Sequence, residues 1–250
     1  MNGSSASPKP FGLSPFDRLR TGLSKPLHLA TIASALLAIA AAPWALALPL
    51  LAFVFKPLTT LLVIAHAWPR GRETPVVRRW VLAGLVLSLA GDVALLWPRQ
   101  GFLPGLIAFL LAHLAYLASF TRVQRLARPA WPFIVYALVA AAILALLWSG
   151  VPAALRLPVA AYVVCLVSMA AQATAVWRGA QGTPAARRAG WLAMGGALFV
   201  TSDALLAVDR FSVPLTAASL WILATYWIAQ WTIASWPSPV HREGDRHPPS

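Results

Sequence analysis

Long apolar segments recur along almost the whole of this 250-residue chain. Each contains about 20 mainly apolar residues, enough for an α-helix to cross the ~30 Å hydrocarbon core of a bilayer. Hydrophobic residues make up 59% of the chain and charged residues only 11%, far from the composition of soluble globular domains. A membrane β-barrel would instead show alternating segments of about ten residues. The sequence therefore predicts an all-α, polytopic membrane protein.

Two polar tails frame the apolar region. Residues 1–26 and 237–250 are rich in Ser, Pro and charged groups, so we expect both to be disordered cytoplasmic tails. Residues 27–236 are expected to form one domain of eight transmembrane helices. The expected spans are 27–42, 47–68, 79–97, 102–121, 131–149, 153–177, 190–208 and 214–236.

The first span has an alternative interpretation as a cleaved signal peptide. A basic region precedes its apolar core, and the small-residue stretch Ala45-Leu46-Ala47 follows it. Against cleavage, the preceding tail is long and the next segment is another membrane span. We therefore expect the first span to remain in the protein.

The basic residues are distributed unevenly between the two sides of the expected membrane. With the N-terminus inside, sixteen of the 20 Lys and Arg residues lie in cytoplasmic segments. The opposite loops hold only Arg99, Arg156 and Arg210, and Lys56 lies within a span. Cytoplasmic loops of membrane proteins carry such an excess of basic residues. This asymmetry supports eight helices with both termini in the cytoplasm, and we expect a multi-pass protein of a bacterial inner membrane.

The formal net charge of +13 does not require a nucleic-acid partner, because the basic residues form no stripe interleaved with aromatic side chains. The enrichment of basic residues in the cytoplasmic segments of a membrane protein explains the net charge better.

Two similar phrases, LAGDVALL (residues 89–96) and VTSDALLA (200–207), each place one aspartate inside an apolar run. The residues around them also correspond if one loop residue is deleted. This correspondence indicates a 4+4 parallel repeat, with accidental similarity of apolar segments as the alternative. The matching positions are Gly84 and Gly195, Asp92 and Asp203, Pro104 and Pro214, and Tyr116 and Tyr226.

Four ionisable side chains lie inside the expected spans, where a charge is costly and normally faces a bundle interior or a wet cavity. At 1.5 Å per residue, Asp92 and Asp203 lie roughly 8 Å below the outer ends of their spans. Lys56 lies about 13 Å and His113 about 16 Å below that edge. The four share one layer, so we expect it to be functional. The accompanying polar residues are Tyr116, Ser202, Tyr226 and Gln230.

Each of these residues also has a purely structural interpretation. Either aspartate could pair with Lys56 only to cancel a buried charge. His113 and Gln230 could be hydrogen-bonding groups between helices. The two tyrosines could be packing residues whose hydroxyls find a partner.

Other site types find little support in the sequence. The one intramembrane histidine and two aspartates lack a zinc-binding spacing, and nearby Lys56 would oppose a cation, so we expect no metal and no cofactor. Neither a Gly-rich phosphate loop nor a Gly-x-Ser-x-Gly motif is present. Ser202 and Asp203 point about 100° apart on a helix, which makes them a poor nucleophile–base pair. Cys165 is expected to be a packing residue.

Several of these stretches, in this order, resemble the lysoplasmalogenase (YhhN-like) family of integral membrane proteins, over roughly residues 27–236. The resemblance implies eight transmembrane helices and cleavage of the vinyl-ether bond of a lysoplasmalogen within the bilayer. The implied products are a fatty aldehyde and glycerophosphoethanolamine or glycerophosphocholine, and the implied catalytic residues are Asp92 and Asp203. The matching stretches are FKPLTT (55–60), LAGDVALL (89–96), AFLLAHLAYLASF (108–120), GALFVTSDALLAVDRF (196–211) and TYWIAQ (225–230).

Vinyl-ether hydrolysis needs a proton donor and a negative group that stabilises the oxocarbenium ion or activates water. Glycosidases meet a similar need with two carboxylates in unlike environments. We therefore expect one aspartate to donate the proton and the other to act in its ionised form, and the sequence leaves open which is which. Lys56, or an outer arginine such as Arg99, is expected to bind the phosphate. The residues expected to orient water and the glycerol oxygens are His113, Tyr116, Tyr226 and Gln230.

A non-enzymatic membrane protein is the alternative. Paired intramembrane carboxylates also serve as proton relays in transporters, and a lipid-binding protein could bury the same groups. Transporters usually place them at the bilayer midplane on broken helices. Lys56-Pro57 is the only such break beside a charge.

Overall fold

The computed structural model describes residues 15–42, 45–97 and 99–237, and within these ranges every regular element is a helix. Eight α-helices and one short 3₁₀-helix follow one another through the described ranges, which confirms the predicted all-α class. The α-helices are α1 (Pro15–Ala40), α2 (Pro49–Ala67), α3 (Pro75–Ala94), α4 (Phe102–Thr121), α5 (Trp131–Leu147), α6 (Ala153–Gly179), α7 (Ala186–Phe211) and α8 (Ala218–Ser235). The 3₁₀-helix η1 (Trp148–Gly150) continues α5.

Five helices in the described ranges are long and apolar enough to cross a membrane, namely α2, α4, α5 with η1, α6 and α7. The chain is therefore an integral membrane protein with several spans. The helix α3 contains Arg78, Arg79 and Asp92, which lower its mean hydropathy. The apolar part of α1 is the shorter stretch Lys25–Ala40.

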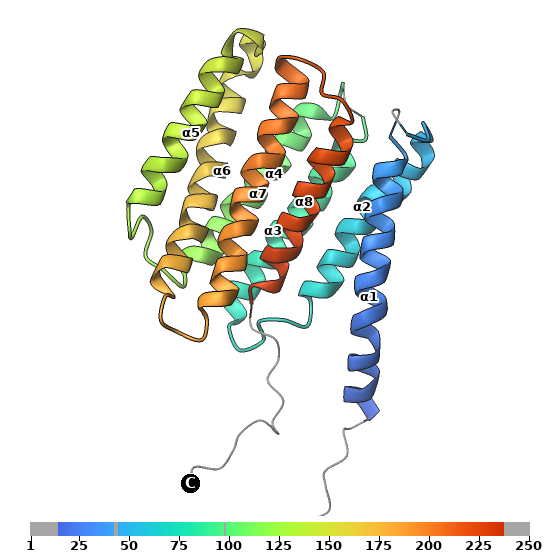
Figure 1. Cartoon of the computed structure of the whole chain (residues 1–250), viewed down its shortest axis with the longest axis vertical. Coiled ribbons are helices and arrows are strands. Elements are labelled where there is room, and N and C mark those ends of the chain that lie inside the picture. The colour runs from blue at the N-terminus through green and yellow to red at the C-terminus, as the bar shows by residue number, and fades with distance from the viewer. Residues whose placement is uncertain (1–14, 43–44, 98, 238–250) are drawn as a thin grey trace, which may run out of the picture.

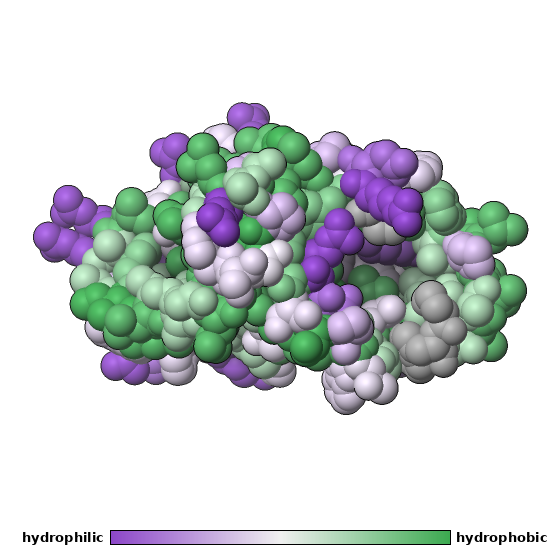
Figure 2. Space-filling model, turned by 90° about the horizontal axis from the view of Figure 1, so that it is seen from above, coloured by the Kyte–Doolittle hydropathy of each residue, from purple (hydrophilic) through white to green (hydrophobic). Residues whose placement is uncertain are grey.

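The helices pack side by side and alternate in direction along the bundle (Figure 1). The start of α1 and the end of α8 lie at the same end, while α1 and α5 form opposite edges (Figure 1). Large leucine side chains project from the sides, with Leu50, Leu146 and Leu157 each about 80% exposed. From above, hydrophobic residues cover much of the outline, as a lipid-facing surface requires (Figure 2).

The helix α1 begins at Pro15, inside the segment 1–26 that we expected to form a disordered tail. An apolar run in the sequence indicates only the part of a helix that the bilayer or the protein covers. It gives no indication that the helix continues into the polar sequence before it, as α1 does. The rest of the two predicted tails, residues 1–14 and 238–250, lies outside the described residues.

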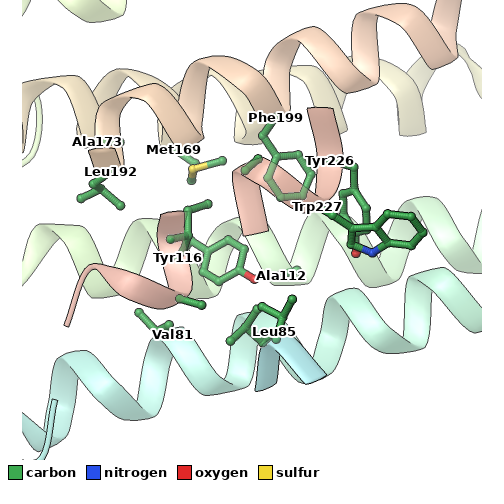
Figure 3. Close-up of a cluster of buried hydrophobic side chains, with 14 of the residues drawn as sticks. Val81, Leu85, Ala112, Tyr116, Met169, Ala173, Leu192, Phe199, Tyr226 and Trp227 are labelled. Carbon is green, nitrogen blue, oxygen red and sulfur yellow. The ribbon is translucent and has the colours of Figure 1, made fainter. Parts of the chain in front are cut away.

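The core lies between α3, α4, α6, α7 and α8 (Figure 3). Leu85, Tyr116, Met169, Leu192 and Phe199 are fully buried there. Of the five helices that are apolar enough to cross a membrane, α6 is the most buried: 67% of its most apolar stretch is buried, against 11% for α5. Small residues let α6 approach α7 closely, because a Cβ at Gly196 would lie 3.0 Å from the Cα of Ala170.

The pairs α3–α4 and α7–α8 are closely packed hairpins. A Cβ on Gly84 of α3 would lie 2.3 Å from the Tyr116 ring of α4, so only glycine admits this ring. A Cβ on Gly195 of α7 would meet the Thr232 hydroxyl of α8 at 2.2 Å. These contacts bring the aspartate-bearing helices α3 and α7 against α4 and α8.

Candidate functional site

A cavity of about 330 Å³ lies toward the end of the bundle where α7 ends and α8 begins. Seven helices, α2 to α8, contribute to its walls, and most of the lining is apolar. Binding sites for small molecules typically combine such an apolar lining with a few polar groups. Its polar and charged lining residues are Lys56, Asp92, Tyr162, Ser202, Asp203, Asp209, Arg210 and Tyr226.

Asp92 lies in the last turn of α3 and is 1% exposed. Its Oδ2 accepts a hydrogen bond from the Thr60 hydroxyl at 2.6 Å and another from the Tyr226 hydroxyl at 2.7 Å. Its Oδ1 lies 3.8 Å from Nζ of Lys56, the only ion pair within the described ranges. Two hydroxyl donors and one ammonium group thus surround this carboxylate.

A chain of hydrogen bonds leads away from Asp92 into the core. The Tyr226 hydroxyl accepts from Nε2 of Gln230 at 3.1 Å, and Oε1 of Gln230 accepts from the Tyr116 hydroxyl at 2.7 Å. On the other side, Nε1 of Trp227 donates to the Thr60 hydroxyl at 3.3 Å. Buried networks of this kind fix the orientation of their members when every polar group has a partner.

Asp203 lies on α7 and faces the same cavity from another wall. Its Oδ2 accepts a hydrogen bond from the hydroxyl of Tyr162 of α6. No cation lies within ion-pairing distance of Asp203 among the residues that the structure describes. The neighbouring Ser202 donates to the backbone carbonyl of Ile222 at 3.0 Å, which joins α7 to α8.

His113 lies behind the cavity wall rather than on it. It is fully buried, and its ring packs edge-on against Phe199 at 4.5 Å and Tyr162 at 5.4 Å between centroids. Neither ring nitrogen has a hydrogen-bond partner among the described residues. His113 therefore lies beside Tyr162, which lines the cavity, but His113 itself does not line it.

The predicted site residues divide into three groups. Lys56, Asp92 and Tyr226 meet at the cavity, with Gln230 and Tyr116 behind them in the same hydrogen-bond network. Ser202 and Asp203 line the same cavity from α7. His113 joins neither set.

Three residues at the site were not singled out in the sequence. Thr60 and Tyr162 each donate to one aspartate, and Arg210, not Arg99, lines the cavity. The sequence could have indicated Tyr162 as a candidate, because it is one of only four tyrosines and lies inside an apolar span. Nothing in the sequence indicated Thr60, because the hydroxyl of a threonine in a membrane helix commonly donates a hydrogen bond to a backbone carbonyl of its own helix.

In the described part of the chain, no three His, Cys, Asp or Glu side chains gather closely enough to hold a metal ion.

Comparison with known proteins gives a consistent set of relatives. A family model described as the YhhN family matches residues 51–236. Lysoplasmalogenase TMEM86B of Homo sapiens is 36% identical over 197 residues, which are 76% of this chain and 77% of that protein. A Mycobacterium bovis protein named lysoplasmalogenase is 30% identical over 186 residues, or 72% of this chain and 66% of that protein.

A third relative is the uncharacterized membrane protein YhhN of Escherichia coli, 39% identical over 98 residues. That match covers 39% of this chain and 46% of the relative. No solved structure is significantly similar to this chain.

Proposed function

This chain belongs to the YhhN family, and from that membership we propose that it is an enzyme, a membrane hydrolase that cleaves the vinyl-ether bond of lysoplasmalogens. The products would be a fatty aldehyde and glycerophosphoethanolamine or glycerophosphocholine. The names of the human and mycobacterial relatives support this activity. An apolar cavity lined by two carboxylates, in a protein embedded in lipid, supports it independently.

The reaction begins with a proton transfer to the vinyl carbon that is remote from the ether oxygen. Asp203 is the proposed donor, because its carboxyl group has one hydroxyl partner and no cation in ion-pairing distance within the described residues. The electron pair of the double bond forms the new C–H bond, which leaves a cation at the adjacent carbon, and a lone pair of the ether oxygen stabilises it as an oxocarbenium ion. An apolar wall favours the uncharged acid before the transfer.

Asp92 is the proposed base and the counter-charge of the oxocarbenium ion. Lys56, Thr60 and Tyr226 all stabilise its ionised form. Asp92 takes a proton from water as the water oxygen bonds to the cationic carbon. Asp203 then takes the hydroxyl proton of the hemiacetal while Asp92 gives its proton to the glycerol oxygen. The hemiacetal separates into aldehyde and alcohol, both aspartates regain their starting protonation states, and one water is consumed.

The supporting residues have different proposed roles. Tyr226, held by Gln230 and through it by Tyr116, fixes the direction of the Asp92 carboxylate. Ser202 holds α7 against α8. His113 supports the ring of Tyr162, the partner of Asp203.

The proposed topology has eight spans with both termini in the cytoplasm of a bacterium. The uneven distribution of basic residues supports it, as does the common end of the bundle at which α1 begins and α8 ends (Figure 1). In this orientation the cavity opens toward the outer half of the inner membrane. The similar hairpins α3–α4 and α7–α8 support an ancestral 4+4 duplication.

The observation that carries the proposal is the pair of unlike carboxylates on one cavity. We expect Asp92→Asn and Asp203→Asn each to lower aldehyde release at least about a hundredfold, as for loss of a general acid or base. Asp209→Asn is the matched control, because Asp209 also lines the cavity but accepts a backbone hydrogen bond from Leu215 at 2.8 Å. Full activity in either of the first two variants would contradict the mechanism.

The assay uses purified protein in detergent with vinyl-ether and ester lysolipids. Hydrolysis needs no sealed compartment, whereas a transporter acts only in vesicles. Absence of aldehyde release with every vinyl-ether lipid, in folded protein, would favour the transporter or lipid-binding alternative.

A further inference from the structure

Arg210 is a charged residue of the cavity that the proposed reaction steps do not use. It lies in the last turn of α7 and is exposed at the end of the cavity nearest the α7–α8 loop. Its guanidinium group lies 5.0 Å from the ring centroid of Phe102 at the start of α4. Stacking on an aromatic ring limits the directions in which an arginine can present its donors.

Arg210 and Asp203 lie on the same face of α7. Arg210 follows Asp203 by seven positions, nearly two helical turns, so their Cα atoms are about 10 Å apart along the axis. Both side chains line the cavity. A ligand that contacts both must therefore carry its reacting group and its anionic group a comparable distance apart.

Arg210 forms no ion pair with any residue that the structure describes. Within the described ranges the only ion pair joins Lys56 to Asp92, so Lys56 is already engaged. The adjacent Asp209 directs its Oδ1 to the backbone N–H of Leu215. The two other arginines of the same side, Arg99 and Arg156, do not line the cavity.

The part of the cavity wall that α5 forms is apolar, and its lining residues have helical spacing. Ala140, Ile143, Leu144 and Leu147 form one stripe of α5 along the cavity. This stripe has no polar side chain and suits an alkyl chain. The cavity therefore offers an apolar wall at α5 to an alkyl chain and the charge of Arg210 to an anionic group.

We propose that Arg210, oriented by Phe102, binds the phosphodiester group of the lysolipid and so selects phosphate-bearing substrates. The inference rests on the proposed function and deepens it by assigning the head-group subsite. A guanidinium fork matches two phosphate oxygens. The glycerol unit, with the lengths of the two side chains, spans the interval from Arg210 to Asp203, which places the vinyl ether at the carboxylates.

The test compares two substrates of equal chain length, lysoplasmenylethanolamine and the alkenylglycerol that lacks phosphate. We expect Arg210→Gln to raise KM for the phospholipid about tenfold, the usual scale for a charge-assisted contact, without raising it for the alkenylglycerol. Arg210→Lys should recover part of the loss, because it keeps the charge but not the fork. An equal KM for the phospholipid in Arg210→Gln and wild type overturns the inference.

Arg156→Gln is the matched control. Arg156 belongs to the same side of the bundle, and its guanidinium also stacks on an aromatic ring, Trp148, at 5.4 Å, but it does not line the cavity. We expect the KM of Arg156→Gln to equal that of the wild type for both substrates. A tenfold rise in Arg156→Gln as well would assign the effect to general surface charge and contradict a specific subsite.

A binding measurement separates failure of this inference from failure of the proposed function. An alkyl-ether lysophospholipid, which lacks the vinyl bond, should raise the melting temperature of wild-type protein more than that of Arg210→Gln. The matching alkylglycerol should act on both equally. If no vinyl-ether lipid is hydrolysed but this difference persists, the proposed reaction fails and the phosphate subsite stands; equal shifts in both proteins refute the subsite.

Discussion

The Tyr226 hydroxyl joins the two halves of the hydrogen-bond network, since it donates to Asp92 and accepts from Gln230. We expect Tyr226→Phe to lower kcat/KM about tenfold to a hundredfold, the usual effect of losing a hydrogen bond to a charged group. Aldehyde release from lysoplasmenylethanolamine measures the effect. Tyr136→Phe, on α5 and away from the cavity lining, is the control and should match wild type. Equal activity of both variants would contradict the role of Tyr226.

The sequence predicted a common layer for the ionisable residues, but it did not predict the direction in which each side chain points. Helical rise placed Lys56, Asp92, Asp203 and His113 in one layer. Which face of each helix turns inward depends on the packing of neighbours that lie far apart in the sequence. As a result, Lys56 pairs with Asp92 rather than Asp203, and His113 turns into the core beside Phe199.

At the scale of helices, the contact between α3 and α4 depends on a missing side chain. The Tyr116 ring occupies the space where a Cβ of Gly84 would stand. We expect Gly84→Ala to destabilise the protein by about 1–3 kcal/mol, the usual cost of overpacking. Thermal unfolding in detergent measures the change.

Gly190→Ala on α7 is the control for that substitution, because its Cβ would have no atom nearer than Nε1 of Trp177 at 3.3 Å. Alanine also favours a helix over glycine by up to about 1 kcal/mol, so this variant should be neutral or slightly stabilised. A Gly84→Ala protein as stable as Gly190→Ala would show that α3 and α4 can separate without cost.

The existence of each helix was more predictable than its ends. Every expected span overlaps an α-helix of the described ranges. A long apolar run favours a helix, because a helix satisfies its backbone hydrogen bonds internally. Helix ends depend on polar sequence that hydropathy does not describe. The helix α7 begins at Ala186, ahead of the expected 190–208, and α1 begins at Pro15.

At the scale of the whole molecule, the decisive question is whether α3 crosses the membrane. It carries Asp92 near one end and Arg78 and Arg79 near the other, and it is not among the five helices apolar enough by composition alone. Burial of Asp92 against α2 and α8 hides that charge from lipid, and arginines at a cytoplasmic helix end reach the interface. We therefore expect α3 to span.

Cysteine labelling tests this expectation, because the chain has a single cysteine, Cys165, which is buried. In a Cys165→Ala background, Glu73→Cys and Gln100→Cys introduce exposed thiols on either side of α3. A membrane-impermeant maleimide should label Gln100→Cys in intact cells and Glu73→Cys only after permeabilisation. Gln181→Cys, in the exposed α6–α7 loop, is the cytoplasmic reference. Labelling of Glu73→Cys and Gln100→Cys from the same side would mean that α3 does not cross the membrane. The proposed position of Asp92 on a membrane-spanning helix would then be wrong.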